Sequence, residues 1–295
     1  MEYHSCGSGF LFTDQIRQSP SLRRSFFSLA QETFGLDLAC WYENGGWQDR
    51  YLPHVLVHNG EIAANVSVNR MTFRLDGKLH SWIQLGTVMT HPRYRGMGLS
   101  RFLLETVLRR WQDRCECLYL FANDSVLDFY PKFGFIPAKE RQLTIPVRPG
   151  PALLRRKLDP STRSDRALLL EAYACSNPYS AFSMENNEGL FLFYLLGPFR
   201  DMLYVLPRQH MVVICWEENE TLFCHELLGS ASIDLQSLLN GIAGPGVRRA
   251  VLGFTTKCPV PDACAQPGDE HLFLLGGTWN PFASRPLQFP DISRA

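Results

Sequence analysis

Apolar side chains recur every three to four positions in two stretches of the first half of the chain. Residues 21–34 place Leu22, Phe26 and Leu29 near one face, and residues 98–112 repeat the pattern. This period is that of an amphipathic helix with one face against a core. We therefore predict a helix in each stretch.

The segment between these helices has the pattern of extended chain. Residues 55–57, 62–75 and 80–90 are β-prone runs, and the breaks between them carry Asn59-Gly60 and Asp76-Gly77. Asn-Gly and Asp-Gly between such runs are strong hairpin signals, so the segment is predicted to be an antiparallel meander. Beyond the second helix we predict a strand, a helix and a hairpin-like pair, at residues 117–121, 125–133 and 135–136 with 143–145.

The second half repeats the order of the first. A proline-rich stretch suggests a linker at 147–160, so we expect a domain at 1–146 and a second lobe at 161–295. The predicted order in that lobe is three strands, a helix and a strand, as in the first. The elements that carry this reading are a helix at 165–174, strands at 202–206, 211–216 and 221–228, a helix at 235–242 and a strand at 249–254.

Composition narrows the class of protein. The chain has 295 residues, of which 45% are hydrophobic, and its 29 basic and 29 acidic side chains cancel. This describes a soluble globular protein and excludes intrinsic disorder. Without a basic excess, nucleic acid is not an expected partner. The longest apolar run, Leu190–Leu196, is too short to span a bilayer, and the first residues lack the pattern of a signal peptide. We therefore expect a cytoplasmic protein that has no membrane partner.

The nine cysteines are odd in number and lie mostly in apolar runs. This predicts reduced, core-filling thiols rather than a disulfide framework. The pairs Cys115/Cys117 and Cys258/Cys264 have no histidine beside them, so no metal site is expected.

The most informative stretch is a strand that runs into a glycine turn and then into the second helix. Gly96 and Gly98 let the backbone approach a ligand closely, and Arg93, Arg95 and Arg101 add positive charge around it. The free N–H groups at a helix N-terminus bind anions. A pyrophosphate is the ligand that this pattern favours.

Two familiar phosphate motifs do not fit. A P-loop ends in Gly-Lys-Ser/Thr, which is missing here. A dinucleotide fingerprint needs a third glycine, but position 101 is arginine, and the preceding meander is not the βαβ unit of that fold.

The remaining pattern, Arg-x-x-Gly-x-Gly after residues 88–92, resembles the acetyl-CoA motif of the GNAT superfamily of acyltransferases. Residues 118–123 and 129–135 resemble the second half-site of that superfamily, with an asparagine after a strand and a tyrosine before a Lys-x-Gly-Phe turn. The resemblance covers roughly residues 20–146. It implies an α/β (α+β) GNAT acyltransferase fold, a mixed and mostly antiparallel sheet flanked by helices, followed here by a second, degenerate GNAT-like lobe.

The resemblance also implies roles for individual residues. Tyr130 would protonate, or donate a hydrogen bond to, the departing thiolate of acetyl-CoA, and an amine would attack the thioester directly. Strand groups at Val88 and Thr90 would pair with the pantetheine arm. The residues expected to bind acetyl-CoA are Val88, Met89, Thr90, Arg93, Arg95, Gly96, Met97, Gly98, Leu99, Ser100 and Asn123.

Several points stay open. The general base could be Glu32, Asp37, Glu43, His91 or Asp124, or a chain of waters, and Trp41, Tyr42 and Trp47 could either wall an acceptor pocket or cap the sheet. The acceptor is a small-molecule or peptide amine of unknown identity, and a homo-oligomer is compatible with the sequence. A non-catalytic acyl-CoA-binding regulatory module is the alternative function.

The two-lobed plan is similar to the enhanced-intracellular-survival type of acetyltransferase. There a sterol-carrier-like third domain follows, and the terminal carboxylate enters the active site. Here only about 40 residues follow Phe254, too few for that domain. The second lobe is expected to be non-catalytic.

Overall fold

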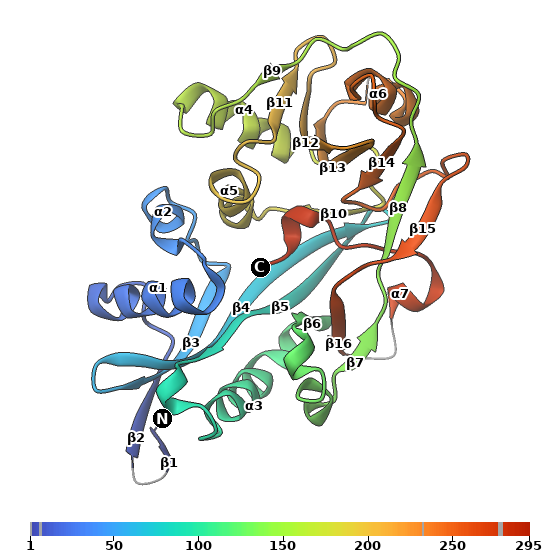
Figure 1. Cartoon of the computed structure of the whole chain (residues 1–295). Helices are drawn as coiled ribbons and strands as arrows, with labels where there is room; N and C mark the ends of the chain where they lie inside the picture. The colour runs from blue at the N-terminus through green and yellow to red at the C-terminus, as the bar shows by residue number, and fades with distance from the viewer. Residues whose placement is uncertain (1, 6–7, 232, 277–279) are drawn as a thin grey trace.

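The structure is a computed structural model that describes residues 2–5, 8–231, 233–276 and 280–295. Two sheets form two lobes, with the first lobe in the lower half of Figure 1 and the second above it. This confirms the predicted fold class, a mixed and mostly antiparallel α/β arrangement followed by a second lobe of the same kind.

The first sheet has the strand order β1-β2-β3-β4-β5-β6-β16-β7, and β10 pairs with β4 at one end. All its pairs are antiparallel except β5 with β6. Its strands are β1 (Glu2–Ser5), β2 (Ser8–Thr13), β3 (Tyr51–His58), β4 (Glu61–Leu75), β5 (Lys78–Thr90), β6 (Cys117–Ala122), β7 (Ile136–Ala138), β10 (Phe182–Glu185) and β16 (His271–Leu275).

The second sheet has the order β15-β8-β14-β13-β12-β11-β9. Its meander β11-β12-β13 is antiparallel and β14 is parallel to β13, which repeats the arrangement of β3 to β6. Its strands are β8 (Arg141–Pro146), β9 (Arg156–Lys157), β11 (Leu203–Leu206), β12 (Met211–Glu218), β13 (Thr221–Gly229), β14 (Arg249–Leu252) and β15 (Cys264–Pro267).

The helices cover both faces of the first sheet and pack on the second. Leu29 of α1 and Leu103 of α3 belong to separate buried clusters on the two faces of the first sheet. The α-helices are α1 (Pro20–Phe34), α2 (Leu38–Glu43), α3 (Leu99–Trp111), α4 (Arg163–Ala174), α5 (Glu188–Leu196), α6 (Leu235–Ile242) and α7 (Pro281–Ser284). The 3₁₀ turns are η1 (Pro92–Tyr94), η2 (Gln112–Arg114), η3 (Asp124–Val126), η4 (Tyr130–Phe133) and η5 (Asp291–Ser293).

The two lobes exchange a strand. β8 follows β7 along the chain but pairs with β14 and β15 in the second sheet. In return, β16 follows β15 along the chain but lies between β6 and β7 in the first sheet. The second sheet is therefore completed by β8, which follows the first lobe along the chain, and the first sheet by β16, which follows the second lobe (Figure 1).

The strand exchange corrects one prediction and bears on another. Residues 135–136 and 143–145 do not form a hairpin, because β7 and β8 lie in different sheets. The division into 1–146, 147–160 and 161–295 stays a prediction, but hydrogen bonding between strands crosses it in both directions.

Other differences are local. The predicted helix 125–133 is two 3₁₀ turns, η3 and η4. The aromatic-rich segment 41–47, which we expect from the sequence to be a loop, begins within the short helix α2. All eight described cysteines are free thiols, but only three of them are buried, so the core-filling prediction was wrong for the exposed ones; Cys6 lies outside the described residues. The exposed thiols are Cys175, Cys258 and Cys264.

Glu226 on β13 is a fully buried carboxyl group that hydrogen bonds link to the side-chain amide of Asn177 and the N–H of Leu227. Burial raises the pKa of Glu226 from 4.5 to about 8. The folded chain therefore keeps a proton that the unfolded chain releases above pH 4.5, so the free energy of unfolding falls as pH rises from about 4.5 to about 8.

In the parent, the free energy of unfolding should fall by on the order of 5 kcal/mol between the two pKa values. Glutamine cannot ionise, so Glu226→Gln is expected to remove much of this loss. The melting temperature of Glu226→Gln should then exceed that of the parent at pH 8.5 and depend less on pH. Calorimetric scans between pH 5.5 and 8.5 measure this. Glu218→Gln, at an exposed position of β12, is the control and should leave the slope unchanged. Equal slopes for the parent and Glu226→Gln would contradict the prediction.

Candidate active site

A β-bulge interrupts the pairing of β4 with β5. Asn65 faces Met89 and Ser67 faces Gly86, so Val66 alone opposes two residues of β5. A bulge leaves backbone groups of the longer strand without ladder partners. Strand groups next to Thr87 are thereby available to a ligand.

A polar network holds the bulge in place. Thr87 has a φ of 43°, a left-handed conformation that costs a β-branched residue on the order of 1–3 kcal/mol. The side-chain amide of Asn65 donates to the Thr87 carbonyl at 2.7 Å, and the Thr87 hydroxyl donates to Ser67 at 2.7 Å. The Tyr51 hydroxyl lies 2.9 Å from that of Thr87, and burial raises the pKa of Tyr51 to about 12, so it stays protonated. Strain held by such a network is typical of a functional site.

β5 and β6 separate close to this bulge. They pair in parallel only from Trp82 with Cys117 to Gln84 with Tyr119, and both strands continue beyond that point. A cavity of about 700 Å³ lies along the separated ends. Its walls include the bulge, the end of β5, residues after β6 and the last residues of the chain.

The start of α3 closes one end of this cavity with features of an anion site. Gly98 precedes the helix with a φ of 77°, and no side chain caps the first turn, which carries no acidic residue. Ser100 lines the cavity and its hydroxyl lies 2.6 Å from that of Thr90. Arg95 also lines the cavity and donates to the Thr90 carbonyl. Uncapped N–H groups, a helix dipole and an arginine together favour a phosphate.

Tyr130 lines the same cavity from η4 and is 5% exposed. The rings of Phe129, Phe135 and Phe273 surround it, with centroids 5.3, 6.1 and 6.0 Å away. Burial raises the pKa of Tyr130 to about 12, so the hydroxyl is a neutral hydrogen-bond donor at physiological pH. Asn123, after β6, is exposed at the cavity edge.

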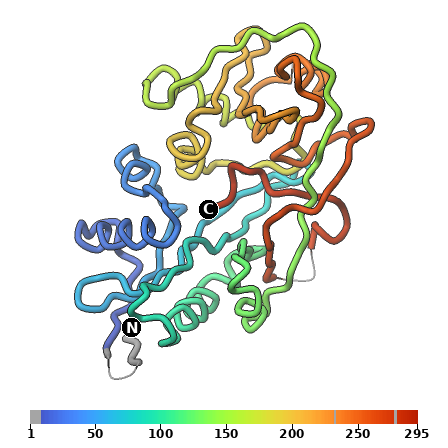
Figure 2. Tube along the Cα trace, in the orientation of Figure 1, coloured from blue at the N-terminus to red at the C-terminus, as the bar shows by residue number. Residues whose placement is uncertain are grey.

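The end of the described chain lies inside the molecule. The N–H of Ala295 donates to the side-chain carbonyl of Gln84 at 3.0 Å, and the Gln84 amide donates to the Ala295 carbonyl at 2.9 Å. A Cβ on Gly86 would come within 2.4 Å of that carbonyl oxygen, so only glycine fits there. Figure 2 shows the red end of the chain at this inner position, between the blue and the yellow parts.

Arg294 anchors this tail. Its guanidinium forms ion pairs with Glu140 and Glu270 and lies 4.7 Å from the ring of Phe121. Burial raises the pKa of Glu140 to about 7, although Arg294 opposes that shift. The hydroxyl of Tyr194, on α5, donates to the Arg294 carbonyl. Both lobes therefore hold the tail against the cavity.

The structure brings together seven of the twelve predicted site residues and places the other five beside them. The residues that line the cavity are Val88, Met89, Thr90, Arg95, Ser100, Asn123 and Tyr130. The other five, which form the turn and the helix start without lining the cavity, are Arg93, Gly96, Met97, Gly98 and Leu99.

None of the five candidate bases lines the cavity. Asp37 caps α2, His91 caps η1, and Asp124 pairs with His271. Ala295, the last residue of the sequence, lines this cavity, and a terminal-carboxylate role for it stays open. Gln84, Gly86 and the Thr87 network could not be found from the sequence. They depend on the register of the β4–β5 bulge and on contacts with Ala295, which no residue pattern indicates.

The second sheet also has an irregular register, between β12 and β13, but its helix start differs from that of α3. There Asp234 caps α6, and its carboxylate accepts from the Ser237 N–H at 2.9 Å, which fills the position that a phosphate would take. Among the described residues, no three acidic, histidine or cysteine side chains gather as metal ligands. Within the same part of the chain, no helix has the length and apolar character needed to cross a bilayer.

Comparison with known proteins agrees with this geometry. Residues 25–138 match the family model described as an acetyltransferase (GNAT) domain. An uncharacterized N-acetyltransferase, ycf52 of Porphyra purpurea, is 30% identical over 101 residues, which are 31% of this chain and 58% of that protein. The match thus spans little more than half of the relative.

Solved structures share the fold over both lobes. A probable N-acyltransferase from Enterococcus faecalis has a TM-score of 0.60 at 15% identity and covers 85% of this chain and 69% of its own. Eis1 from Mycobacterium abscessus has a TM-score of 0.53 at 14% identity, with 90% of this chain and 72% of its own covered. At these identities the likeness concerns the fold. Residues 25–138, with their glycine turn, bulged strand and separated strand pair, are a domain of the GNAT acetyltransferase family.

Proposed function

We propose that this chain is an N-acetyltransferase that moves an acetyl group from acetyl-CoA to a primary amine in a ternary complex. The observation that carries the proposal is the cavity between β5 and β6, which runs from the uncapped start of α3 to Tyr130. The anion-binding end of the cavity suits the pyrophosphate of acetyl-CoA, the end of β5 suits its pantetheine arm, and the Tyr130 hydroxyl suits its thioester sulfur.

The residues present fit acetyl-CoA. The N–H groups at Gly98, Leu99 and Ser100 with Arg95 would hold the pyrophosphate, and Val88 and Thr90 would pair with the pantetheine arm as an added strand does. The bulge supplies a strand N–H for the thioester oxygen. Acetyl-CoA contributes the activated acetyl carbonyl.

The chemistry needs a neutral amine. Its nitrogen bonds to the thioester carbon as the carbon–sulfur bond breaks, which yields the acetamide and the CoA thiol. An acceptor that arrives as an ammonium ion loses two protons in all. One goes to the solvent when the neutral amine forms, and the other goes to the sulfur as CoA leaves as a thiol. Tyr130, protonated at physiological pH, would donate its hydrogen bond to the departing sulfur.

Gly98→Val is expected to weaken acetyl-CoA binding at least 10-fold, because a β-branched residue disfavours a φ of 77° and its methyl groups would crowd the phosphate. Isothermal titration calorimetry measures the affinity and gives the stoichiometry, which should be one per chain because Asp234 caps α6. Gly77→Val is the control: Gly77 has a φ of 80° in the β4–β5 turn, with no heavy atom within 4 Å of its added Cβ. It carries the same strain and should keep parental affinity. Unchanged affinity in Gly98→Val, or two sites per chain, would contradict the assignment.

The function itself is tested by thiol release from acetyl-CoA in the presence of a panel of primary amines. We expect amine-dependent release with equimolar acetamide formation. Tight acetyl-CoA binding without turnover of any amine would instead identify the non-catalytic acyl-CoA-binding module.

A further inference from the structure

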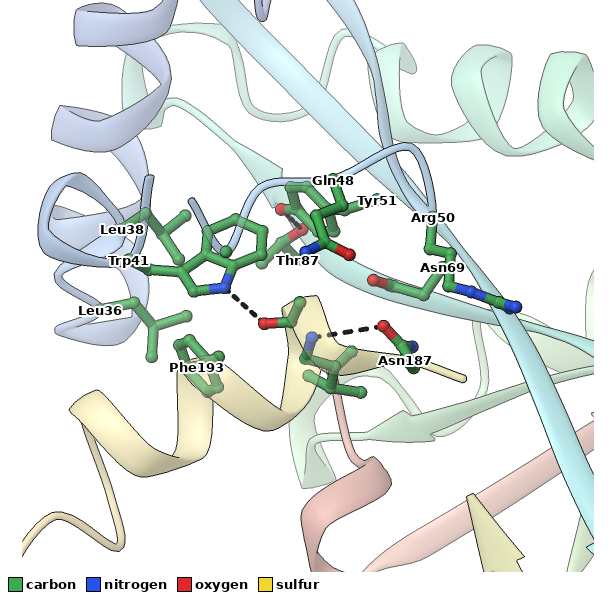
Figure 3. Close-up of a pocket in the computed structure, with 14 residues that line it drawn as sticks. Leu36, Leu38, Trp41, Gln48, Arg50, Tyr51, Asn69, Thr87, Asn187 and Phe193 are labelled. Carbon is green, nitrogen blue, oxygen red and sulfur yellow. Dashed lines mark hydrogen bonds between the residues drawn. The ribbon is translucent and has the colours of Figure 1, made fainter. Parts of the chain in front are cut away.

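A second cavity meets the first at the bulge. It is narrow, about 50 Å³, and Thr87 and Ala295 line both cavities. Its walls come from the α1–α2 region, β3, β4 and α5 (Figure 3). The Trp41 indole donates to the Gly189 carbonyl at 2.7 Å, which ties α2 to the helix of the other lobe. The cavity is therefore a fixed space at the point where an amine must approach the thioester.

Most of this second cavity is apolar. Figure 3 shows Leu36, Leu38, Trp41 and Phe193 grouped at one end, with Arg50, Asn69 and Asn187 at the other. The apolar walls are Leu36, Leu38, Trp41, Tyr51, Leu190 and Phe193. Since cavities of about 150 Å³ hold a benzene ring, a space of about 50 Å³ suits a small branched aliphatic group better than an aromatic ring.

The charge of the lining side chains disfavours polycations as ligands. Among its described lining residues Arg50 is the one charged side chain, and no carboxylate side chain is present. Arg50 is fixed, because its guanidinium donates to the Arg70 carbonyl at 2.9 Å and to Thr72 at 3.2 Å. A second cation on the acceptor would be desolvated beside this arginine, and no side chain of the described lining carries a negative charge that could pair with it.

Asn69 adds an oriented donor. It is 4% exposed, and within the described part of the chain its side-chain nitrogen has no hydrogen-bond partner. That nitrogen lies 3.1 Å from the position of a Cβ on Gly86, and thus faces the junction of the two cavities. A buried unpaired donor is unfavourable unless a ligand oxygen meets it.

The geometry points to an acceptor of one class: a compound with a single amine, a carbonyl oxygen beside that amine and a small branched aliphatic group, as in leucine derivatives or peptide N-termini. This assignment rests on the proposed function. The amine would lie at Thr87, the carbonyl oxygen at Asn69 and the aliphatic group against Leu36 and Phe193.

The test compares kcat/KM for leucinamide, lysinamide, phenylalaninamide and spermidine. Leucinamide should exceed lysinamide and spermidine at least 10-fold, because it lacks their additional cation, and should exceed phenylalaninamide because of size. A short peptide that begins with leucine distinguishes a peptide N-terminus from a free amino-acid derivative. A preference for spermidine or lysinamide, or no turnover of leucinamide by a chain that acetylates other amines, would overturn the inference. Failure to bind acetyl-CoA would overturn the proposed function instead.

A matched pair of variants tests the charge argument. Leu36 lies between α1 and α2 and is half-buried, so polar substitutions there leave the sheet core intact. Leu36→Asp should raise the ratio of kcat/KM for lysinamide over leucinamide at least 10-fold, whereas the isosteric Leu36→Asn should change it little. Acetyl-CoA affinity should be the same in both. An equal change in the two variants would show that Leu36 does not face the acceptor's side chain.

Discussion

Tyr130→Phe is expected to lower turnover about 10²–10³-fold, because it removes one hydrogen bond that matters only as charge develops on sulfur. The ring would keep its contacts with Phe129, Phe135 and Phe273, so the melting temperature and the acetyl-CoA affinity should change little. Steady-state kinetics with a good amine acceptor measure the effect. Since burial raises the pKa of Tyr130 to about 12, the parent should show no loss of activity from ionisation of this phenol up to pH 10.

Tyr179→Phe is the matched control for Tyr130→Phe. Its hydroxyl donates to the Ile233 carbonyl in the second lobe, away from the residues of the two cavities. This variant loses a partly buried hydrogen bond and should keep parental turnover. If Tyr130→Phe turned over acetyl-CoA as the parent does, Tyr130 would be a core aromatic and the hydrogen-bond donor to sulfur would have to be another group.

Arg294→Met is expected to destabilise the protein by about 3–5 kcal/mol at pH 8.5, because it leaves the carboxyl group of Glu140 buried without its cation. This corresponds to a melting temperature lower by roughly 10 °C. The loss should be smaller at pH 6, where Glu140, with its raised pKa of about 7, takes up a proton. Turnover should also fall, since the tail that places Ala295 beside Gln84 loses its anchor.

The double variant Glu140→Gln, Arg294→Met separates the charge from the packing. Glutamine keeps the oxygen that accepts the N–H of Phe289, and no charge remains buried. The double variant should recover most of the lost stability at pH 8.5. Equal melting temperatures for the parent and Arg294→Met would show that the ion pair does not hold the tail.

The meander and its flanking helices could be predicted because local signals agree there. Ser19 and Gly35 bound α1 as a cap and a left-handed stop, and Asn59-Gly60 and Asp76-Gly77 mark the two hairpins. The repeat in the second half was also correct in element order, and the structure adds that β13 and β14 pair in parallel, as β5 and β6 do.

Other elements depend on partners that are distant in sequence. β8 and β16 are extended segments whose neighbours lie more than 100 residues away, so no local pattern shows which sheet each joins. Helix α5 was missed for the opposite reason. It is apolar on nearly all sides because it packs between the lobes. A helix without a polar face shows no alternation of apolar and polar residues at the helical period, so the sequence pattern does not reveal it.

The site residues also fall into those that local sequence predicts and those that depend on distant contacts. The glycine turn and Tyr130 carry a recognisable spacing of residue types, and the structure puts seven of the twelve predicted residues on one cavity. The bulge at Thr87 and the docking of Ala295 on Gln84 depend on register and on the return of the chain, which spacing does not encode.

The reciprocal exchange of β8 and β16 has a consequence for how the protein is made. During synthesis the first sheet cannot close until residue 275 has left the ribosome, since β16 fills the place between β6 and β7. Until then the nascent first lobe exposes an unpaired edge of β6, which invites pairing with other chains. Contacts of such long sequence separation form slowly. Refolding should therefore be slow and dependent on protein concentration, and a fragment that stops before β16 should aggregate rather than fold as an independent lobe.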